Sequence, residues 1–343
     1  MVRLGLIVSC IWTICYCIHG AIIPQAHFAP AIKPSTSPSS SSIPLPLVIW
    51  HGLGDNYKAE GLRSVGVLAN KTNPGTFTYY IRLDPDPSGD RTATFLGNVN
   101  SQVEKVCADL ASHPVLSKAP AINAIGFSQG GQFIRAYVER CNDPPVANLV
   151  TFGSQHNGIS EFQNCEADDW ACQGWQGLLR GNTWSAFVQN KLVPAQYFRN
   201  PKDLENYLEH SNFLADLNNE RTIKNNTYKK NIQKLERFVM YVFEEDKTVV
   251  PKESGWFSEV NETTQKVTKL QDRSIYVEDW LGLRSLDERD RLEFRTTEGG
   301  HMQLSEKVLV DTFERYFRPR ANPAPEGSWS NAVEEFDNRI QEL

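Results

Sequence analysis

The chain is organised around one stretch, Ala121-Ile122-Asn123-Ala124-Ile125-Gly126-Phe127-Ser128-Gln129-Gly130-Gly131. A short apolar run ends there in the pattern G-x-S-x-G, and a segment with apolar residues at helical spacing follows at once. A strand, a sharp turn and a helix in this order are typical of a nucleophile elbow, whose strained turn exposes a serine hydroxyl at the edge of a sheet. Gly126 and Gly130 leave room for the strand and the helix to pass without Cβ clashes. We therefore predict that Ser128 is a nucleophile; the alternative is a Gly-rich turn that only joins strand to helix.

The composition is that of an ordinary soluble globular protein. The 343 residues, 40% of them hydrophobic and 22% charged, suffice for one large α/β domain or two smaller ones. The net charge is −6 with acids and bases interspersed, so nothing indicates nucleic acid or an anionic membrane as a partner. The cysteines lack C-x-x-C spacing, and neither H-E-x-x-H nor a phosphate-binding loop with its lysine occurs. We therefore expect no metal and no cofactor.

The N-terminal end is predicted to be a targeting segment. Arg3 is followed by an apolar run too short to span a bilayer comfortably, and small residues follow at Gly20-Ala21. This pattern favours a cleaved secretory signal over 1–20, with an uncleaved signal anchor as the alternative. No other stretch of the sequence is long and apolar enough for a transmembrane helix. A Pro/Ser-rich segment over 21–46 is predicted to be a disordered spacer.

Removal of the signal would leave an even number of cysteines in an oxidising compartment. These four are Cys107, Cys141, Cys165 and Cys172. They allow three pairings, and closure of the shortest loop favours Cys165–Cys172, which leaves Cys107 with Cys141. Three sequons fit a secretory route as glycosylation sites, although such triplets also arise by chance; their asparagines are Asn70, Asn225 and Asn261.

Apolar runs and segments of helical spacing alternate along the chain. Strands are predicted at 47–50, 79–83, 147–152 and 238–243, and helices over 100–110, from the elbow to about Cys141 and over 304–317. This alternation favours an α/β fold with a mostly parallel central sheet over 47–318, followed by a linker and tail over 319–343. Roughly 85 residues separate the strands at 147–152 and 238–243, far more than an α/β connection needs. We predict a helical cap inserted over about 157–235; a second domain with its own core is the alternative.

A serine hydroxyl becomes nucleophilic only beside a base, and the base needs a carboxylate to fix its tautomer. In α/β hydrolases these residues follow in the order serine, acid, histidine. Only His301 follows an acid that itself lies after a late strand, and its Gly-rich loop precedes the final helix. The acid should lie directly after the strand at 238–243. Asp246 is favoured there over Glu245 because its shorter side chain holds a tighter geometry.

Negative charge that develops on a substrate oxygen needs preorganised hydrogen-bond donors. One is expected to be the backbone N–H of Gln129, directly after the nucleophile, and the other that of Leu53, in the loop after the first strand. His51 begins this loop and is interpreted as a turn residue with no chemical role. His156 either lines the site or is a loop histidine held by the backbone.

Five longer motifs spread over the chain point to a known family. They are Leu47–Asp55, Asn98–Val103 with Cys107, Gly126–Arg135, Phe213–Asn218 and Glu298–Glu306. Together they resemble palmitoyl-protein thioesterase of the lysosomal type, over nearly the whole chain that follows the spacer. The resemblance implies an α/β-hydrolase fold with a helical insertion. The implied activity is removal of long-chain acyl groups from cysteine thioesters, with S-acylated proteins or peptides and fatty-acyl thioesters as partners. The implied location is the secretory pathway, ending in the lysosome or vacuole or outside the cell.

Carried over to matching positions, the resemblance implies Ser128 as nucleophile, Asp246 as acid and His301 as base. The aromatic residues of the cap would line an apolar groove for the acyl chain. The implied disulfides are Cys107–Cys141 and Cys165–Cys172.

One departure and two alternatives accompany the resemblance. Asn56-Tyr57-Lys58 stands where the family's relatives carry a cysteine pair, so no bridge holds this loop. The alternative functions are a lipase or esterase that uses the same triad on lipid oxygen esters, and a non-catalytic lipid carrier that reuses the fold.

Overall fold

A computed structural model describes residues 44–161, 181–319 and 331–333. All of them fall within one compact unit, Ser42–Leu343. Several predictions concern parts outside the described residues. These are the signal over 1–20, nearly all of the spacer over 21–46, the pair Cys165–Cys172 and most of the tail over 319–343.

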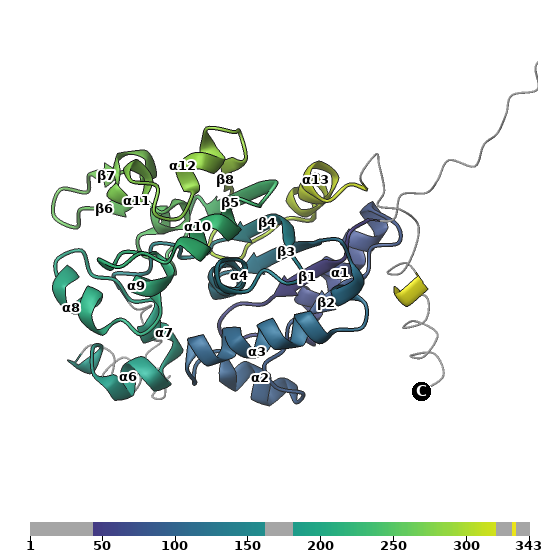
Figure 1. The fold of residues 1–343 in the computed structure, drawn as a ribbon, viewed down its shortest axis with the longest axis horizontal. Helices are drawn as coiled ribbons and strands as arrows, with labels where there is room; N and C mark the ends of the chain where they lie inside the picture. Colours follow the sequence, from purple (N-terminus) through teal and green to yellow (C-terminus); the bar gives the residue numbers. More distant parts are fainter. Residues whose placement is uncertain (1–43, 162–180, 320–330, 334–343) are drawn as a thin grey trace, which may run out of the picture. The chain divides into compact units, whose positions relative to one another are not determined.

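Six parallel strands form the central sheet in the order β2-β1-β3-β4-β5-β8 (Figure 1). The strands are β1 (Leu47–Trp50), β2 (Thr78–Tyr80), β3 (Ile122–Phe127), β4 (Val146–Phe152), β5 (Arg237–Phe243) and β8 (Leu292–Thr297). Every residue of β1, β3 and β4 is buried, as expected for parallel strands that are covered on both faces. The predicted α/β class with a mostly parallel sheet is confirmed.

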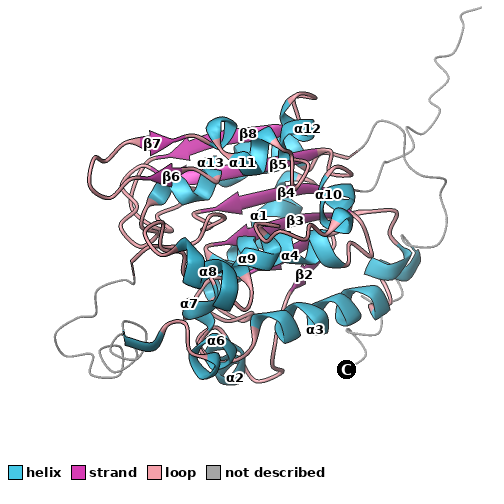
Figure 2. Cartoon of the chain, turned by 60° about the vertical axis from the view of Figure 1, so that its left-hand side comes forward, coloured by secondary structure: helices cyan, strands magenta, loops and turns pink. Residues whose placement is uncertain are grey.

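Helices cover both faces of the sheet. On one side lie α1 (Glu60–Thr72) and α13 (Glu306–Tyr316); on the other lie α3 (Val99–Ser112), α4 (Gln129–Arg140) and α10 (Asn226–Ile232). Figure 2 shows α4 and α10 in front of the strands. Alternate residues of β1 belong to the two apolar clusters, one on each face of the sheet, because successive side chains of a strand point to opposite faces. Val48 and Trp50 pack with the α3 and α4 side, whereas Leu47 and Ile49 pack with the α1 and α13 side.

A run of short helices lies between β4 and β5. The described ones are α6 (Ala186–Lys191), α7 (Val193–Gln196), α8 (Leu204–His210), α9 (Leu214–Leu217) and α10. Val188 of α6 packs with Leu192 and Ala195 in a small separate cluster, whereas the other buried apolar side chains of α7 to α10 belong to the same cluster as those of the sheet and α4. Tyr207 and Phe213 are fully buried in it, and the ring of Phe213 meets that of Phe133 edge-on at 5.7 Å. These two aromatics therefore stabilise the core, and the expectation that they line an acyl groove is wrong.

The remaining elements were not indicated by the sequence. They are α2 (Pro87–Ala93), α11 (Ser274–Val277), α12 (Leu283–Asp287), the antiparallel pair β6 (Glu259–Val260) and β7 (Val267–Thr268), and three 3₁₀ turns (Leu116–Lys118, Lys252–Trp256, Leu270–Asp272). The second strand also ends earlier than expected, at Tyr80. The Leu83 N–H donates to the carboxylate of Asp90 at 2.7 Å, so by that residue the chain has left the sheet.

A disulfide joins Cys107 of α3 to Cys141 at the end of α4, with the two Cα atoms 6.0 Å apart. This pairing confirms the prediction. A link across 34 residues of sequence is expected to stabilise the fold by roughly 3–4 kcal/mol, mainly because it restricts the unfolded chain. None of the helices in the described ranges combines the length and apolar character that crossing a bilayer requires.

Candidate active site

Ser128 occupies a strained turn between β3 and α4. Its backbone φ is +52° and its ψ −126°, a conformation that residues with a side chain rarely adopt. The turn is held from two directions. The Ser128 N–H donates to the carbonyl of Phe152 in β4 at 2.8 Å. A Cβ on Gly126 would lie 2.3 Å from the Cα of Gly131, so only glycine lets strand and helix approach this closely. The turn therefore has the geometry of a nucleophile elbow.

His301 brings its imidazole to this serine from the loop after β8. Its Nε2 lies 3.0 Å from Ser128 Oγ, and its Nδ1 lies 2.7 Å from Asp246 Oδ2. The imidazole packs closely on the backbone of Gly153, where a Cβ would lie 3.1 Å from His301 Cε1. The side chain of His301 is 14% exposed and that of Asp246 only 1%. The three side chains come from the ends of β3, β5 and β8, which meet at the carboxyl edge of the parallel sheet.

Asp246 is held as a carboxylate. Burial alone would raise its pKa, but the hydrogen bond and charge of His301 and the N–H groups of Val249 and Thr248 outweigh burial, so the pKa lies below its usual range. A carboxylate on Nδ1 keeps a proton there and leaves Nε2 free to accept one from the serine. Glu245, the alternative acid, is exposed to solvent. The structure thus brings Asp246, the acid favoured from sequence, to His301.

The loop after β1 lies directly against the elbow. A Cβ on Gly52, the residue before Leu53, would come within 3.1 Å of the Ser128 Cβ. Within the described residues, neither the Leu53 N–H nor the Gln129 N–H donates a hydrogen bond to a protein acceptor. Gln129 begins α4, whose first N–H groups have no partner inside the helix. Both N–H groups predicted to be oxyanion donors thus have no protein acceptor in the described part of the chain.

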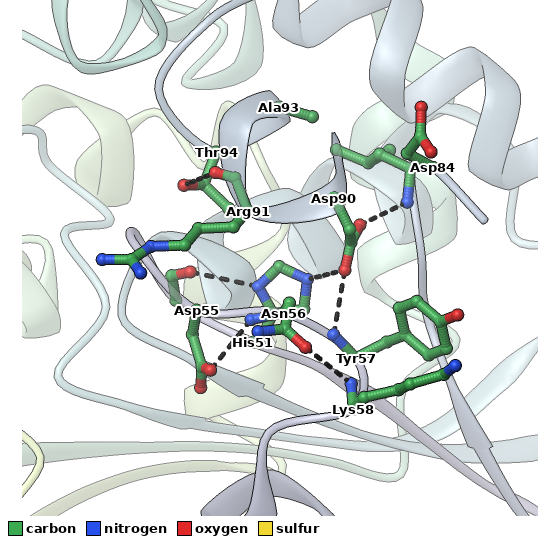
Figure 3. Close-up of polar contacts among 12 residues, drawn as sticks. His51, Asp55, Asn56, Tyr57, Lys58, Asp84, Asp90, Arg91, Ala93 and Thr94 are labelled. Carbon is green, nitrogen blue, oxygen red and sulfur yellow. Dashed lines mark hydrogen bonds and ion pairs between the residues drawn. The ribbon is translucent and has the colours of Figure 1, made fainter. Parts of the chain in front are cut away.

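Two other histidines have structural partners that the sequence did not indicate. His51 is 1% exposed, and its Nε2 lies 2.9 Å from Asp90 Oδ2 (Figure 3). His156 is fully buried, bonds Thr151 Oγ1 through Nε2 at 3.0 Å and stacks on Phe257 at 5.0 Å. Burial lowers the pKa of His156 well below its usual value, so this ring is a neutral part of the core. No group of three or more His, Cys, Asp or Glu side chains in the described ranges is placed to hold a metal.

A parallel sheet flanked by helices, a strained serine turn and the chain order Ser-Asp-His define an α/β hydrolase. Comparison with known proteins places the chain more narrowly. The model of the family described as palmitoyl protein thioesterase matches residues 46–301. The chain belongs to this family, and it is a hydrolase.

Curated relatives support the assignment. Palmitoyl-protein thioesterase 1 of Caenorhabditis elegans is 37% identical over 278 residues, which cover 80% of this chain and 92% of that one. Palmitoyl-protein thioesterase 3 of Dictyostelium discoideum is 35% identical over 260 residues, covering 75% and 84%. The human lysosomal thioesterase PPT2 is 26% identical over 249 residues, covering 70% and 76%. Among solved structures, the RedJ thioesterase of Streptomyces coelicolor has a TM-score of 0.41 and 12% identity, covering 82% of this chain and 96% of that one. The assignment rests on the sequence matches alone.

Proposed function

We propose that this chain hydrolyses long-chain fatty-acyl thioesters, such as palmitoyl groups on cysteines of S-acylated proteins and peptides, through an acyl-serine intermediate. Ser128 is the nucleophile, His301 the general base and Asp246 the acid that orients it. One observation carries the proposal: the imidazole of His301 bridges the serine hydroxyl at 3.0 Å and the carboxylate at 2.7 Å. Membership of the palmitoyl protein thioesterase family supports the choice of substrate.

Acylation begins when Nε2 of His301 takes the proton of the Ser128 hydroxyl as Oγ adds to the thioester carbonyl carbon. The carbonyl oxygen becomes negatively charged and accepts hydrogen bonds from the backbone N–H groups of Leu53 and Gln129. The C–S bond then breaks and the cysteine sulfur leaves. It takes the proton that His301 holds, and the acyl group stays on Oγ. Asp246 remains a carboxylate throughout and stabilises the imidazolium that forms.

Deacylation repeats these steps with water in place of the serine. His301 removes a proton from water, the resulting hydroxide adds to the acyl carbon, and the oxyanion uses the same two donors. The bond to Oγ breaks, Ser128 recovers its proton from His301, and the fatty acid departs. No group outside the described side chains, backbone donors and water is needed to balance either half.

The decisive variant is Ser128→Ala. It removes the attacking oxygen and is expected to lower kcat on a palmitoyl thioester by about 10⁴-fold or more, while the protein stays folded. A fluorophosphonate should label Ser128 covalently in the wild type and leave Ser128→Ala unlabelled. Wild-type turnover by Ser128→Ala would contradict the assignment of the nucleophile. Labelling without hydrolysis of thioesters, but with hydrolysis of oxygen esters, would assign the same triad to an esterase. Absence of labelling together with absence of hydrolysis of either ester type would indicate a lipid carrier.

We propose the lysosome, reached through the secretory pathway, as the site of action. The relatives named as lysosomal, the N-terminal apolar segment and the Cys107–Cys141 disulfide support this route. The three sequon asparagines are exposed, as a glycosylation site requires. A shift in electrophoretic mobility after removal of N-glycans, lost in variants with Gln at these positions, would test the modification. The asparagines are Asn70, Asn225 and Asn261.

A further inference from the structure

The oxyanion loop, residues 51–57, carries Leu53 and has no cysteine to hold it. Hydrogen bonds nevertheless hold this loop at both ends and in the middle. They come from the helix α2 (Pro87–Ala93) and from Thr94, the residue directly after the helix. Two buried polar side chains of this segment make the contacts: Asp90, which is 0% exposed, and Thr94, which is 1% exposed. They are four residues apart, so they lie on one face of the helical turn.

Asp90 holds the two ends of the loop. Its Oδ2 accepts a hydrogen bond from His51 Nε2 at 2.9 Å and another from the Tyr57 N–H at 2.9 Å, as Figure 3 shows. Its Oδ1 accepts from the Leu83 N–H at 2.7 Å, which fixes the carboxylate itself. The remaining nitrogen of the His51 ring, Nδ1, lies 3.1 Å from the Gly52 carbonyl oxygen. The first residue of the loop and the last are thus joined through one buried carboxylate.

Thr94 holds the middle of the loop and contacts the side chain of Gln129, the residue whose N–H is taken as the second donor. Its Oγ1 accepts from the Gly54 N–H at 2.9 Å and donates to the Arg91 carbonyl at 2.6 Å. Its own carbonyl accepts from the side chain of Gln129 at 3.3 Å. Gly54 follows Leu53 directly, and its N–H belongs to the peptide unit that joins the two residues. The hydrogen bond to Thr94 therefore fixes the backbone directly after the Leu53 donor. One residue therefore contacts both segments that supply the oxyanion donors.

We propose that Asp90 and Thr94 are positioning residues of the oxyanion hole, which hold the Leu53 N–H in register with the Gln129 N–H. They act on the transition state without touching the substrate. This inference rests on the proposed function only in taking Leu53 and Gln129 as the oxyanion donors. Donors aimed at an oxyanion contribute only while their placement is accurate to a fraction of an ångström. Loss of a hydrogen bond from Asp90 or Thr94 to the loop should therefore weaken binding of the transition state more than binding of the substrate.

Thr94→Val tests this with almost no change of shape. The variant leaves the Gly54 N–H without its acceptor, and kcat on a soluble palmitoyl thioester is expected to fall about 10- to 100-fold with KM nearly unchanged. A palmityl trifluoromethyl ketone, whose adduct places an oxyanion in the hole, should lose affinity by the same factor. A palmityl thioether, which has no carbonyl, should bind as before. Thr94→Ser keeps the hydroxyl and should restore all these values.

A matched control is available on the same helix. Thr92 is exposed, and its hydroxyl bonds only the Ser88 carbonyl in the described part of the chain, so Thr92→Val should change neither kcat nor the ketone affinity. Asp90→Asn provides a second test, because a carboxamide presents an N–H to at least one of the three donors that the carboxylate accepts. It should also lower kcat and ketone affinity together. If it does not fold, Thr94→Val still decides the matter.

The proposal is overturned if Thr94→Val keeps wild-type kcat and ketone affinity, or if it weakens the thioether as much as the ketone. The second result would show a general distortion of the pocket. The rate at which a fluorophosphonate labels Ser128 gives the same comparison without a thioester, since the phosphonyl oxygen also occupies the oxyanion hole. Failure of the wild type on thioesters would therefore refute the proposed substrate, whereas a labelling rate unaffected by Thr94→Val would refute the positioning role.

Discussion

Two histidine–aspartate pairs lie close to the same serine turn: His301 contacts Ser128 itself, and His51 precedes Gly52, which packs against the Ser128 side chain. In one, His301 Nδ1 meets Asp246 at 2.7 Å; in the other, His51 Nε2 meets Asp90 at 2.9 Å. Each carboxylate also accepts two backbone N–H groups, and each has a pKa below its usual range although burial alone would raise it. As pairs they are nearly equivalent.

The difference lies in what the second ring nitrogen faces. In His301 this nitrogen meets the Ser128 hydroxyl, which has a proton to give; in His51 it meets the Gly52 carbonyl oxygen, which can only accept. The side chain of His301 is also 14% exposed, whereas that of His51 is 1% exposed. A histidine–aspartate pair is therefore not by itself a general base. Its role is set by the third partner and by access to the substrate.

The largest expected effect separates the two histidines. His301→Gln should lower kcat on the thioester by about 10⁴-fold or more, because Ser128 loses its base, while the free energy of unfolding changes little. His51→Gln should act in the opposite way. It breaks a buried pair and is expected to destabilise the fold by about 3–5 kcal/mol, with a loss of rate of at most about 100-fold. Denaturant titrations and steady-state kinetics on both variants measure the two quantities.

One result in particular would contradict the conclusion that only the His301 pair acts as a base. If His51→Gln, measured where it is fully folded, lost as much rate as His301→Gln, then the His51 pair would have to take part in the chemistry. A large loss of stability confined to His51→Gln, together with a much larger loss of rate in His301→Gln, would agree with the assignment above.

The next largest effect concerns the acid. Asp246→Asn is expected to lower kcat by about 10³- to 10⁴-fold, because the amide can present an N–H to Nδ1 and favour the tautomer whose Nε2 already carries a proton. Glu245→Gln is the matched control: its side chain is adjacent in sequence but exposed, and the variant should keep the wild-type rate. Steady-state kinetics on the same thioester compares the two. A large loss in Glu245→Gln, with none in Asp246→Asn, would reverse the choice of acid.

The sequence predicted the parts of the site that local patterns encode. The elbow follows from glycines that the backbone crossing needs, and β1, β3, β4 and β5 are apolar runs. Ser128, Asp246 and His301 could be selected without coordinates because their order along parallel strands determines which loops meet. The helix α1 could also have been found, since Leu62, Val65 and Ala69 are buried at helical spacing.

The second pair could not be predicted in this way. The helix α2 has the sequence PSGDRTA, which contains no apolar stripe, so nothing in its pattern indicates a buried face. Asp90 stands among acids that resemble solvated surface charges, and its partner His51 is 39 residues away. The loop over 51–57 is held by hydrogen bonds between polar groups, whereas sequence patterns indicate mainly which apolar residues are buried. The prediction that Tyr207 and Phe213 line an acyl groove was wrong for a related reason. Composition does not show which aromatic side chains face the core and which face a ligand.

The smallest expected effect compares the two carboxylates through pH. A group whose pKa is lower in the folded state stabilises the fold above its unfolded value, about 3.9 for aspartate, and loses this contribution as pH falls through the folded value. Both Asp90 and Asp246 have lowered pKa values, with burial opposed by hydrogen bonds from histidine and backbone. Asp90→Asn should therefore be less stable than wild type by about 3 kcal/mol at pH 6. That difference should narrow once the pH falls below about 4.

Asp246→Asn should show the same trend with a smaller difference at pH 6, because its histidine partner is 14% exposed and that of Asp90 only 1%. Denaturant unfolding at several pH values between 3 and 6 measures both gaps, with Glu245→Gln as the variant expected to show none. A gap for Asp90→Asn that stayed constant down to pH 3 would mean that the carboxylate charge contributes nothing to folding. The His51 pair would then act only through its shape, and the likeness between the two pairs would end at their geometry.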